Sequence, residues 1–462
     1  MAIGKVTSAS TRKATIIIYD PTIPQGSYLE LKHPVAPVLG QISTLNRTEK
    51  AEIAEVELLG HSDGRGGTKR VEIPPDIGAD VRHAETTLIR DVLGVQTRTQ
   101  TGLYLGKLYG HDIKVFIHYP ALIQQHVAVI AKTGGGKSYT VGVMVEELLK
   151  RGIPIVVIDP HGEYVSAAYQ NDNKRDLGRM GQYGVVPRGY YDRITEFSPD
   201  TEANKSAQPL RFDERNFDVD DIIAISTIGD SDSQRAILER TMYLCKQMGR
   251  PTTFTNLIRI VEKEKSQSKY RLISELHRLR TMPLFQDIPT KLHHIVRKNG
   301  LTIINLRGAP EDVQCVCAAR VCKRIFEEAK RNPSFPSCLV IIEEAHNFVP
   351  EMSRTIASKP IYAIASEGRK FGVGLCVVSQ RTARVSKNVL AQCHSFVIHK
   401  LTNTEDLKAV GESLEGFTAQ MTEEVQRLPV GVALVSTTGL PHPVIVEVRP
   451  RESKHGGVAK VV

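Results

Sequence analysis

Apolar runs of four to seven residues alternate with segments of helical spacing through most of the chain after residue 126. Each run is long enough to form one buried strand. Strands that alternate with helices form a parallel sheet buried between helical layers. The sequence therefore predicts an α/β core, with strands at residues 126–130, 153–159, 301–306, 339–342, 374–379 and 396–399 and two more within 431–448.

The N-terminal part of the chain has a different pattern. Short β-type runs at residues 13–19, 28–31, 36–43 and 52–59 are separated by proline, glycine and charged residues, and residues 60–67 are typical of a flexible hairpin tip. Short strands at such spacing favour a small barrel. We expect a β-barrel domain over residues 1–110.

A long insertion separates two of the predicted core strands. Residues 182–300 are too many for a simple loop, and their later half has helical spacing, so we predict a mostly helical insertion. The core then comprises residues 111–181 and 301–448, and residues 449–462 form a C-terminal tail. Basic residues are dense between 263 and 298, which fits either contact with a phosphate backbone or a solvated helix face.

A glycine-rich loop follows the first core strand and precedes an amphipathic helix. Consecutive glycines let backbone N–H groups point at one anion, Lys137 adds a charge, and Ser138 is placed to hold magnesium. A turn that merely joined strand and helix would not explain the Lys-Ser pair. The usual pattern opens with glycine, whereas Ala131 stands here, which matters only if that position needs a positive φ. The predicted ATP-binding residues are Thr133, Gly134, Gly135, Gly136, Lys137, Ser138 and Tyr139.

Two carboxylates follow the apolar run at 339–342. A buried strand of a parallel sheet delivers such acids to the sheet edge where phosphates bind. Glu343 can hold Mg²⁺ through water, together with Ser138, and Glu344 can polarise an attacking water. One carboxylate at a strand end is commonly a helix cap, but two in a chain with a phosphate loop favour a hydrolysis site.

Three more residues are candidates for the same site. Asp159 follows the strand next to the phosphate loop and can orient water or the metal's surroundings, or cap a turn. Gln380 follows another strand, where its amide can sense the γ-phosphate, or simply occupy a turn. Arg369 lies beyond a helix, where it is either a surface charge or an arginine finger offered to a neighbouring site.

Composition narrows the class of protein. The net charge of +9 favours contact with a polyanion. No apolar run approaches the ~20 residues that cross a bilayer, and seven cysteines without a paired framework fit reduced thiols, so we expect a cytoplasmic protein. Cys315, Cys317 and Cys322 are close in sequence, but their spacing on a helix favours buried small residues over metal ligands.

Several motifs, taken together with the β-rich N-terminus, resemble the HerA family of the HerA/FtsK superfamily. They span nearly the whole chain in order: the phosphate loop, Asp159-Pro160-His161-Gly162-Glu163-Tyr164, Ile342-Glu343-Glu344-Ala345-His346, Glu367-Gly368-Arg369-Lys370-Phe371-Gly372 and Ser379-Gln380-Arg381. The resemblance implies a HAS-barrel, a RecA-like P-loop ATPase core with a helical insertion, and a homo-hexameric ring around double-stranded DNA. ATP and Mg²⁺ would be its cofactors.

The same resemblance implies residue roles and partners. Lys137 and Ser138 would hold phosphate and magnesium, Glu343 would be the metal-side acid, Glu344 the catalytic glutamate, and Arg369 a finger across the subunit boundary. The implied activity is ATP-dependent DNA translocation or unwinding with a NurA-like nuclease, in DNA end resection and recombination repair. The alternative is a HerA-like ring that scaffolds and activates an effector in antiviral defence.

Other classes of protein fit less well. A RecA-like recombinase would lack the N-terminal barrel, a membrane-anchored conjugative pump would need a membrane segment, and an ABC-type ATPase would have a Leu-Ser-Gly-Gly signature, which does not occur. A scaffold with a purely structural ATP site would need nucleotide affinity but no catalytic glutamate. The presence of both Glu343 and Glu344 favours an enzyme.

Overall fold

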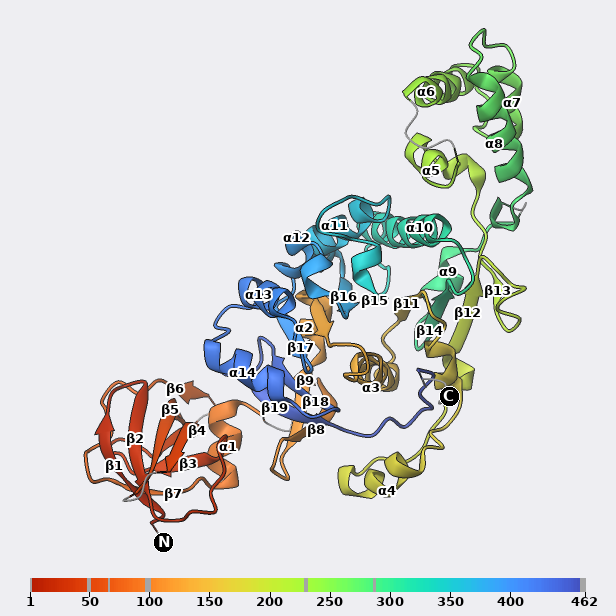
Figure 1. Ribbon diagram of the computed structural model, residues 1–462. Coiled ribbons are helices and arrows are strands. Elements are labelled where there is room, and N and C mark those ends of the chain that lie inside the picture. Colours follow the sequence, from red (N-terminus) through yellow and green to blue (C-terminus); the bar gives the residue numbers. More distant parts are fainter. Residues whose placement is uncertain are drawn as a thin grey trace. The chain divides into compact units, whose positions relative to one another are not determined.

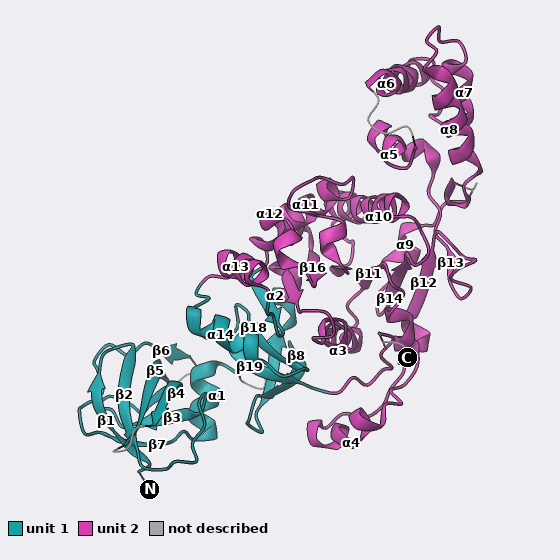
Figure 2. Ribbon diagram, in the orientation of Figure 1, with its two compact units in different colours: residues 1–121, 394–402, 416–449 teal, residues 122–393, 403–415, 450–462 magenta. Residues whose placement is uncertain are grey.

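The structure is a computed structural model that describes residues 2–47, 51–64, 67–95, 101–227, 232–285 and 288–457. The chain forms two compact units, shown in Figures 1 and 2: unit 1 contains residues 1–121, 394–402 and 416–449, and unit 2 contains residues 122–393, 403–415 and 450–462. This division differs from the predicted domains because strands after residue 394 pair within unit 1. Residues 65–66 of the predicted hairpin tip and 458–462 of the predicted tail lie outside the described residues.

Unit 1 begins with a closed six-stranded barrel. The strands run in the order β2-β1-β7-β3-β4-β5, and β5 pairs back to β2, while the short β6 adds to β5. Alternate side chains of β2 point inward, as the apolar alternation requires. The barrel strands are β1 (Gly4–Ala9), β2 (Lys13–Ile18), β3 (Tyr28–Leu31), β4 (Val38–Arg47), β5 (Glu52–Ser62), β6 (Thr68–Lys69) and β7 (Asp80–His83). The predicted barrel is confirmed.

An antiparallel sheet completes unit 1. Its strands pair in the order β17-β18-β19-β8-β9. They are β17 (Ser395–Ile398), β18 (Val432–Ser436), β19 (Val444–Val448), β8 (Gly102–Leu108) and β9 (Lys114–His118), with the helices α1 (Thr86–Leu93) and α14 (Ala419–Arg427) in the same unit.

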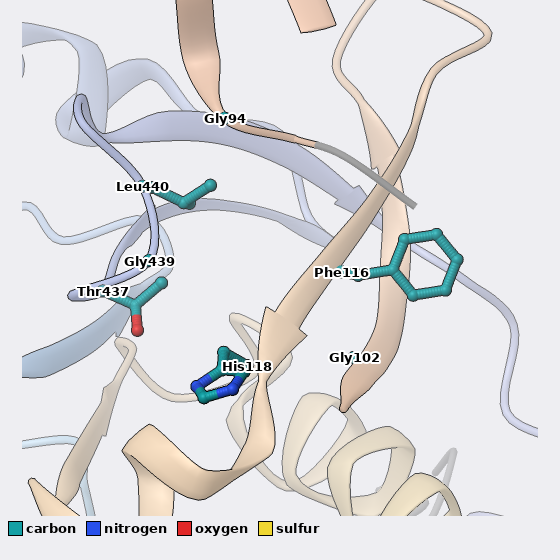
Figure 3. A pocket seen from close by; sticks show the side chains of 7 residues that line it. All are labelled: Gly94, Gly102, Phe116, His118, Thr437, Gly439 and Leu440. Atoms are coloured by element: carbon teal, nitrogen blue, oxygen red, sulfur yellow. The ribbon is translucent and has the colours of Figure 1, made fainter. Parts of the chain in front are cut away.

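Unit 1 also contains a small pocket, shown in Figure 3. It is lined by Gly94, Gly102, Phe116, His118, Thr437, Gly439 and Leu440. Apart from His118, its lining residues have no ionisable side chain.

Unit 2 is built on a parallel sheet in the order β13-β12-β14-β11-β15-β16-β10. Every residue of its central strands is buried, which explains their continuous apolar sequences. The strands are β10 (Val127–Ile130), β11 (Ile155–Asp159), β12 (Ile194–Ser198), β13 (Gln208–Pro209), β14 (Leu301–Asn305), β15 (Cys338–Ile342) and β16 (Val373–Ser379). The α/β prediction is confirmed.

The connecting helices of unit 2 include α3 (Lys137–Lys150), α4 (Lys174–Tyr183), α10 (Glu311–Arg331), α11 (Ser358–Glu367), α12 (Lys387–Leu390) and α13 (Thr404–Ser413). Cys317 and Cys322 are buried on α10 and Cys315 is half-buried, as expected for small apolar residues. None of the described helices is both long and apolar enough to cross a membrane.

The later part of the predicted insertion is helical. It contains α5 (Val219–Ala224), α6 (Asp232–Gln247), α7 (Phe254–Val261), α8 (Lys269–Thr281) and α9 (Leu292–Ile295), and α7 packs on both α6 and α8. Its earlier part supplies β12 to the parallel sheet, which the sequence did not predict. Glu196 of β12 accepts a hydrogen bond from Asn305 of the neighbouring strand, so this strand lacks a continuous apolar pattern.

Candidate nucleotide-hydrolysis site

The loop between β10 and α3 has the backbone of an anion-binding loop. Gly134 (φ 73°) and Gly136 (φ 109°) lie in the left-handed region that favours glycine. A Cβ added to Gly135 would lie 2.9 Å from the carbonyl oxygen of Lys132, so a larger residue would not fit. No side chain among the described residues caps α3, which leaves its first N–H groups available to an anion.

Ala131 replaces the first glycine of the usual pattern without penalty. It is fully buried at the end of β10, and it does not adopt a positive φ. A positive φ, the backbone conformation that disfavours residues with a Cβ, is therefore not required at position 131.

Lys137 and the two predicted acids are brought together at the sheet edge. β15 pairs with β11 and β16, and β16 pairs with β10, so Glu343 and Glu344 follow β15 at the same edge as the phosphate loop. The Lys137 Nζ lies 2.7 Å from Glu344 Oε1 and 3.4 Å from Glu343 Oε2. Burial lowers the pKa of Lys137, but both carboxylates outweigh it, so its pKa lies above the ordinary value. The ammonium is therefore charged at neutral pH.

Glu344 has an unusual backbone. Its φ of 48° places a residue with a Cβ in the left-handed region, although only 4% of it is exposed. Such a conformation costs of order 1–3 kcal/mol and persists only where surrounding contacts hold it. The turn directs the side chain of Glu344 toward Lys137 rather than along the strand.

Asp159 caps the turn that follows β11. Its carboxylate accepts hydrogen bonds from the backbone N–H groups of His161 (3.1 Å), Gly162 (2.9 Å) and Tyr164 (3.1 Å). Burial raises its pKa to about 7, while these three bonds oppose the rise. Of the two interpretations of Asp159 from sequence, the capping one agrees with this geometry, and contact with water or metal stays a prediction.

Tyr164 is a site residue that sequence reasoning missed. It is fully buried, and its hydroxyl donates a hydrogen bond to Glu343 Oε1. Burial raises the pKa of Glu343, whereas Lys137 and this hydroxyl lower it, with burial prevailing. A buried tyrosine needs a partner for its hydroxyl, but the sequence does not reveal which one. Asp159 orients Tyr164 by accepting its backbone N–H, and the hydroxyl of Tyr164 in turn donates a hydrogen bond to Glu343.

Replacing Tyr164 with phenylalanine is expected to raise the Mg²⁺ concentration needed for half-maximal ATP hydrolysis by about tenfold, because removing a residue that supports a metal ligand typically costs 10–100-fold in affinity. The measurement is hydrolysis against Mg²⁺ concentration. Tyr183→Phe is the matched control, since Tyr183 is also buried but its hydroxyl bonds to Arg179 on α4. An unchanged Mg²⁺ requirement in Tyr164→Phe would contradict the role of Tyr164.

Gln380 reaches the phosphate loop. It follows β16, and its side-chain oxygen accepts a hydrogen bond from the hydroxyl of Thr133. This contact places the amide at the edge where Lys137 and Glu344 lie. Sensing of a phosphate by Gln380 stays a prediction.

Arg369 lies away from this site. It is exposed in the short turn η6 (Gly368–Phe371), just before β16 begins. The phosphate loop follows the opposite end of the sheet, because Ile130 pairs with Ser379, the last residue of β16. The seven residues of β16 separate the two positions by roughly 20 Å. Arg369 therefore does not serve the site of its own chain.

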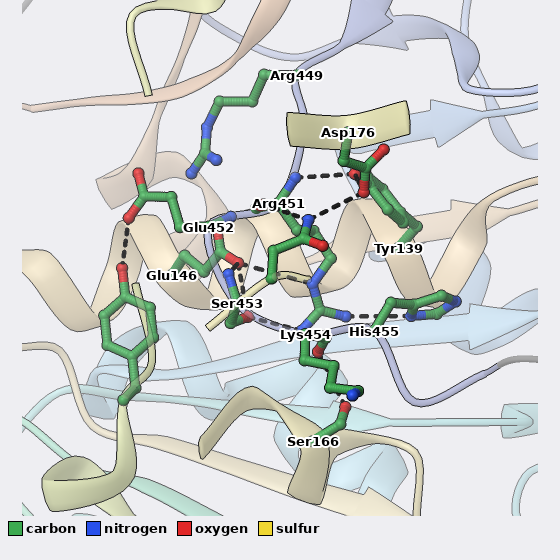
Figure 4. Close-up of polar contacts among 12 residues, drawn as sticks. Tyr139, Glu146, Ser166, Asp176, Arg449, Arg451, Glu452, Ser453, Lys454 and His455 are labelled. Atoms are coloured by element: carbon green, nitrogen blue, oxygen red, sulfur yellow. Dashed lines mark hydrogen bonds and ion pairs between the residues drawn. The ribbon is translucent and has the colours of Figure 1, made fainter. Parts of the chain in front are cut away.

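A segment of residues 450–457, named here the strap, docks on α3 through the polar contacts drawn in Figure 4. The carboxylate of Glu146 on α3 accepts hydrogen bonds from the backbone N–H groups of Glu452 (3.1 Å) and Ser453 (2.9 Å). The hydroxyl of Tyr139 donates to Asp176 and accepts from the backbone N–H of Arg451. The hydroxyl of Tyr139 is thus hydrogen-bonded away from the phosphate loop. If Tyr139 contacts ATP as predicted, it does so through its backbone.

Gly142 provides the space in which the strap's arginine lies. A Cβ at this position would lie 2.5 Å from Nη1 and 2.7 Å from Nε of Arg451, whose side chain is buried. We expect Gly142→Ala to destabilise the protein by roughly 1–3 kcal/mol through overpacking. Gly178→Ala is the control, since a Cβ there meets nothing within 4 Å. Urea unfolding of both variants tests this, and equal stability would contradict the packing.

The residues at this edge fit ATP and Mg²⁺. Hard cations prefer oxygen ligands, and a hydroxyl at Ser138 with a carboxylate at Glu343 is such a pair. The glycine loop leaves backbone donors for phosphates, and Lys137 adds a positive charge. The site thus has the parts of an ATP-hydrolysing P-loop enzyme.

The chain is similar to several known proteins. The family model described as "Helicase HerA, central domain" matches residues 103–325. The chain is 25% identical to the DNA double-strand break repair helicase HerA of Sulfolobus acidocaldarius, over 99% of this chain and 95% of that protein. It is 26% identical to the corresponding helicase of Sulfurisphaera tokodaii, over 99% and 94%. The VirB4 structure of Thermoanaerobacter pseudethanolicus has a similar fold, with a TM-score of 0.53 and 15% identity over 75% of this chain and 96% of that one.

Proposed function

We propose that this chain, which is HerA-like over nearly its whole length, is an ATP-dependent translocase or helicase of double-stranded DNA. Its relatives are named as DNA double-strand break repair helicases. One observation supports the proposal most: the ends of β10, β15 and β16 bring together Lys137, Glu344 and Gln380. A chain that only bound nucleotide would not need the acid beside the lysine.

Each residue at this edge has a role in hydrolysis under this proposal. Backbone N–H groups of the loop and Lys137 would hold the phosphates of ATP, and Ser138 and Glu343 would hold a magnesium ion, which would supply charge neutralisation. Glu344 accepts the proton of the water that attacks the γ-phosphorus, as the bond to ADP breaks. Gln380 hydrogen-bonds the γ-phosphate and so distinguishes ATP from ADP.

The place of Arg369 supports an assembly of several copies. Its guanidinium lies at the opposite end of the sheet from its own phosphate loop. A head-to-tail ring brings this end of one subunit to the site of the next, where the guanidinium neutralises the transferring phosphoryl group. We infer a homo-hexamer by analogy with HerA.

Double-stranded DNA is the proposed polymer along which the protein moves. The net charge of +9 favours contact with a polyanion. Lysine and arginine side chains that contact phosphates give an affinity that falls with salt and is indifferent to sequence. A translocase requires such contacts because it must move over any sequence.

The proposed biological setting is DNA double-strand break repair. As the resemblance to the HerA family implies, the ring acts with a NurA-like nuclease in DNA end resection for recombination repair. No observation favours the alternative of a ring that scaffolds an antiviral effector. The contact between Lys137 and Glu344 supports a working ATPase instead.

The test is ATP hydrolysis with and without duplex DNA, on a sample whose particle mass is measured in the same buffer. We expect duplex DNA to stimulate hydrolysis in a particle several times heavier than the 51.1 kDa chain. DNA-independent hydrolysis by a monomer would contradict the proposal.

A further inference from the structure

His346 lies beside the predicted catalytic glutamate. It belongs to the short turn η5 (Ala345–Asn347) that follows β15, and 11% of its side chain is exposed. Its Nδ1 lies 3.3 Å from Glu344 Oε2 and 3.1 Å from the hydroxyl oxygen of Ser379. One ring nitrogen thus faces both the acid and the end of β16.

The two oxygens of Glu344 face different partners. Oε1 lies 2.7 Å from the Lys137 Nζ. Oε2 is buried and makes no conventional hydrogen bond within the described structure, and the imidazole of His346 approaches it. A buried carboxylate oxygen without a donor is costly, and the tautomer of His346 that carries a proton on Nδ1 offers it a donor at 3.3 Å.

His346 also completes a ring of contacts that returns to the phosphate loop. Its partner Ser379 is the last residue of β16 and directly precedes Gln380. Gln380 accepts a hydrogen bond from Thr133 in the loop, and Lys137 at the end of that loop contacts Glu344. The acid and the predicted γ-phosphate sensor are therefore linked through a single imidazole.

A neutral His346 can donate one hydrogen bond through Nδ1. Burial lowers its pKa, Glu344 raises it, and the positive charges of Arg381, Arg384 and Lys137 lower it further. A neutral imidazole has one N–H, which Nδ1 can donate to Glu344 or to Ser379 but not to both. The Ser379 oxygen already accepts the backbone N–H of Arg381, so its own hydrogen is free to turn toward Nδ1 in the other tautomer.

We propose that His346 is a positioning residue: its Nδ1 fixes the carboxylate of Glu344 so that Oε1 faces the phosphate loop, and it ties this orientation to the strand end that presents Gln380. The inference rests on the proposed ATPase function. It adds a residue that neither the phosphate loop nor the acid pair includes. It also connects the contacts of Gln380 to the carboxylate of Glu344.

Two substitutions of His346 distinguish a positioning role of its Nδ1 from a role in packing alone. Asparagine places its amide near the position of Nδ1, whereas glutamine places its amide near that of Nε2. We expect His346→Gln to lower kcat by about 10–100-fold, as loss of a supporting residue does, and His346→Asn to stay within about threefold of wild type. The affinity for a fluorescent ATP analogue is expected to change less than twofold in both variants.

A double-mutant cycle tests the link to β16. Ser379→Ala is expected to lower kcat, and adding it to His346→Gln is expected to cause no further loss, since both changes break the same connection. Additive losses would overturn the link, and equal losses in His346→Asn and His346→Gln would overturn the positioning role. An unchanged kcat in His346→Gln would overturn it as well.

Failure of the proposed function has a different outcome. A wild-type chain without ATP hydrolysis would contradict that function. The positioning role of His346 is then tested by comparing crystal structures of the wild type and of His346→Gln. A Glu344 carboxylate with the same orientation in both would overturn the inference. A carboxylate that turns in the variant would support it.

Discussion

Glu344→Gln is expected to lower the kcat of ATP hydrolysis by about 10²–10⁴-fold, the usual contribution of a general base. Glutamine has the same shape but cannot accept the proton of the attacking water. The affinity for ATP is expected to stay near that of wild type, because the loop and Lys137 bind the phosphates. Steady-state hydrolysis and equilibrium binding of a fluorescent ATP analogue measure the two quantities.

Glu415→Gln serves as the control for Glu344→Gln. Glu415 is exposed and follows α13, so the same chemical change there is expected to leave hydrolysis unchanged. DNA-stimulated turnover that persisted in Glu344→Gln would contradict the assignment of the base. A loss of ATP binding that matched the loss of turnover would assign Glu344 to binding instead.

Arg369→Ala is expected to lower kcat by about 10³-fold or more, because an arginine finger typically contributes 10³–10⁵ in rate. The side chain is exposed and its own phosphate loop lies at the other end of β16, so we expect the effect to arise in the neighbouring site. Hydrolysis by the assembled particle is the measurement, with its mass checked in solution.

Lys370→Ala is the matched control for Arg369→Ala. Lys370 is also exposed and lies in the same turn, so a general disturbance of η6 would affect both variants. Equal activity of the two variants would mean that Arg369 is an ordinary surface charge, which was the alternative from sequence.

The apolar pattern predicted the core strands because strands buried on both faces need continuous apolar residues. It failed where a strand is short or partly polar. β1 contains one large apolar residue, Val6, and β7 likewise only Val81, yet both are strands of the barrel. In β12, the buried Glu196 is stabilised by its bond to Asn305, and such pairing is invisible in a local pattern.

The candidate site was predictable to the extent that local motifs define it. The glycine loop and the acids after β15 are read from consecutive residues, and the sheet places them together. The bond between Tyr164 and Glu343 and the contact of His346 with Ser379 join residues far apart in sequence, so only the fold reveals them. The docking of the strap on α3 is likewise visible only in the fold, because the sequence pattern predicted no more than a C-terminal tail over residues 449–462.

Under the proposed function, two adjoining copies of the chain build each hydrolysis site. Mixing Glu344→Gln chains with Arg369→Ala chains tests it most directly. Each variant alone is expected to be inactive, and the mixture is expected to regain hydrolysis, since at equal amounts about a quarter of the interfaces combine an intact Glu344 with an intact Arg369 from the next subunit. A mixture that exchanges subunits yet stays as inactive as either variant alone would contradict the claim.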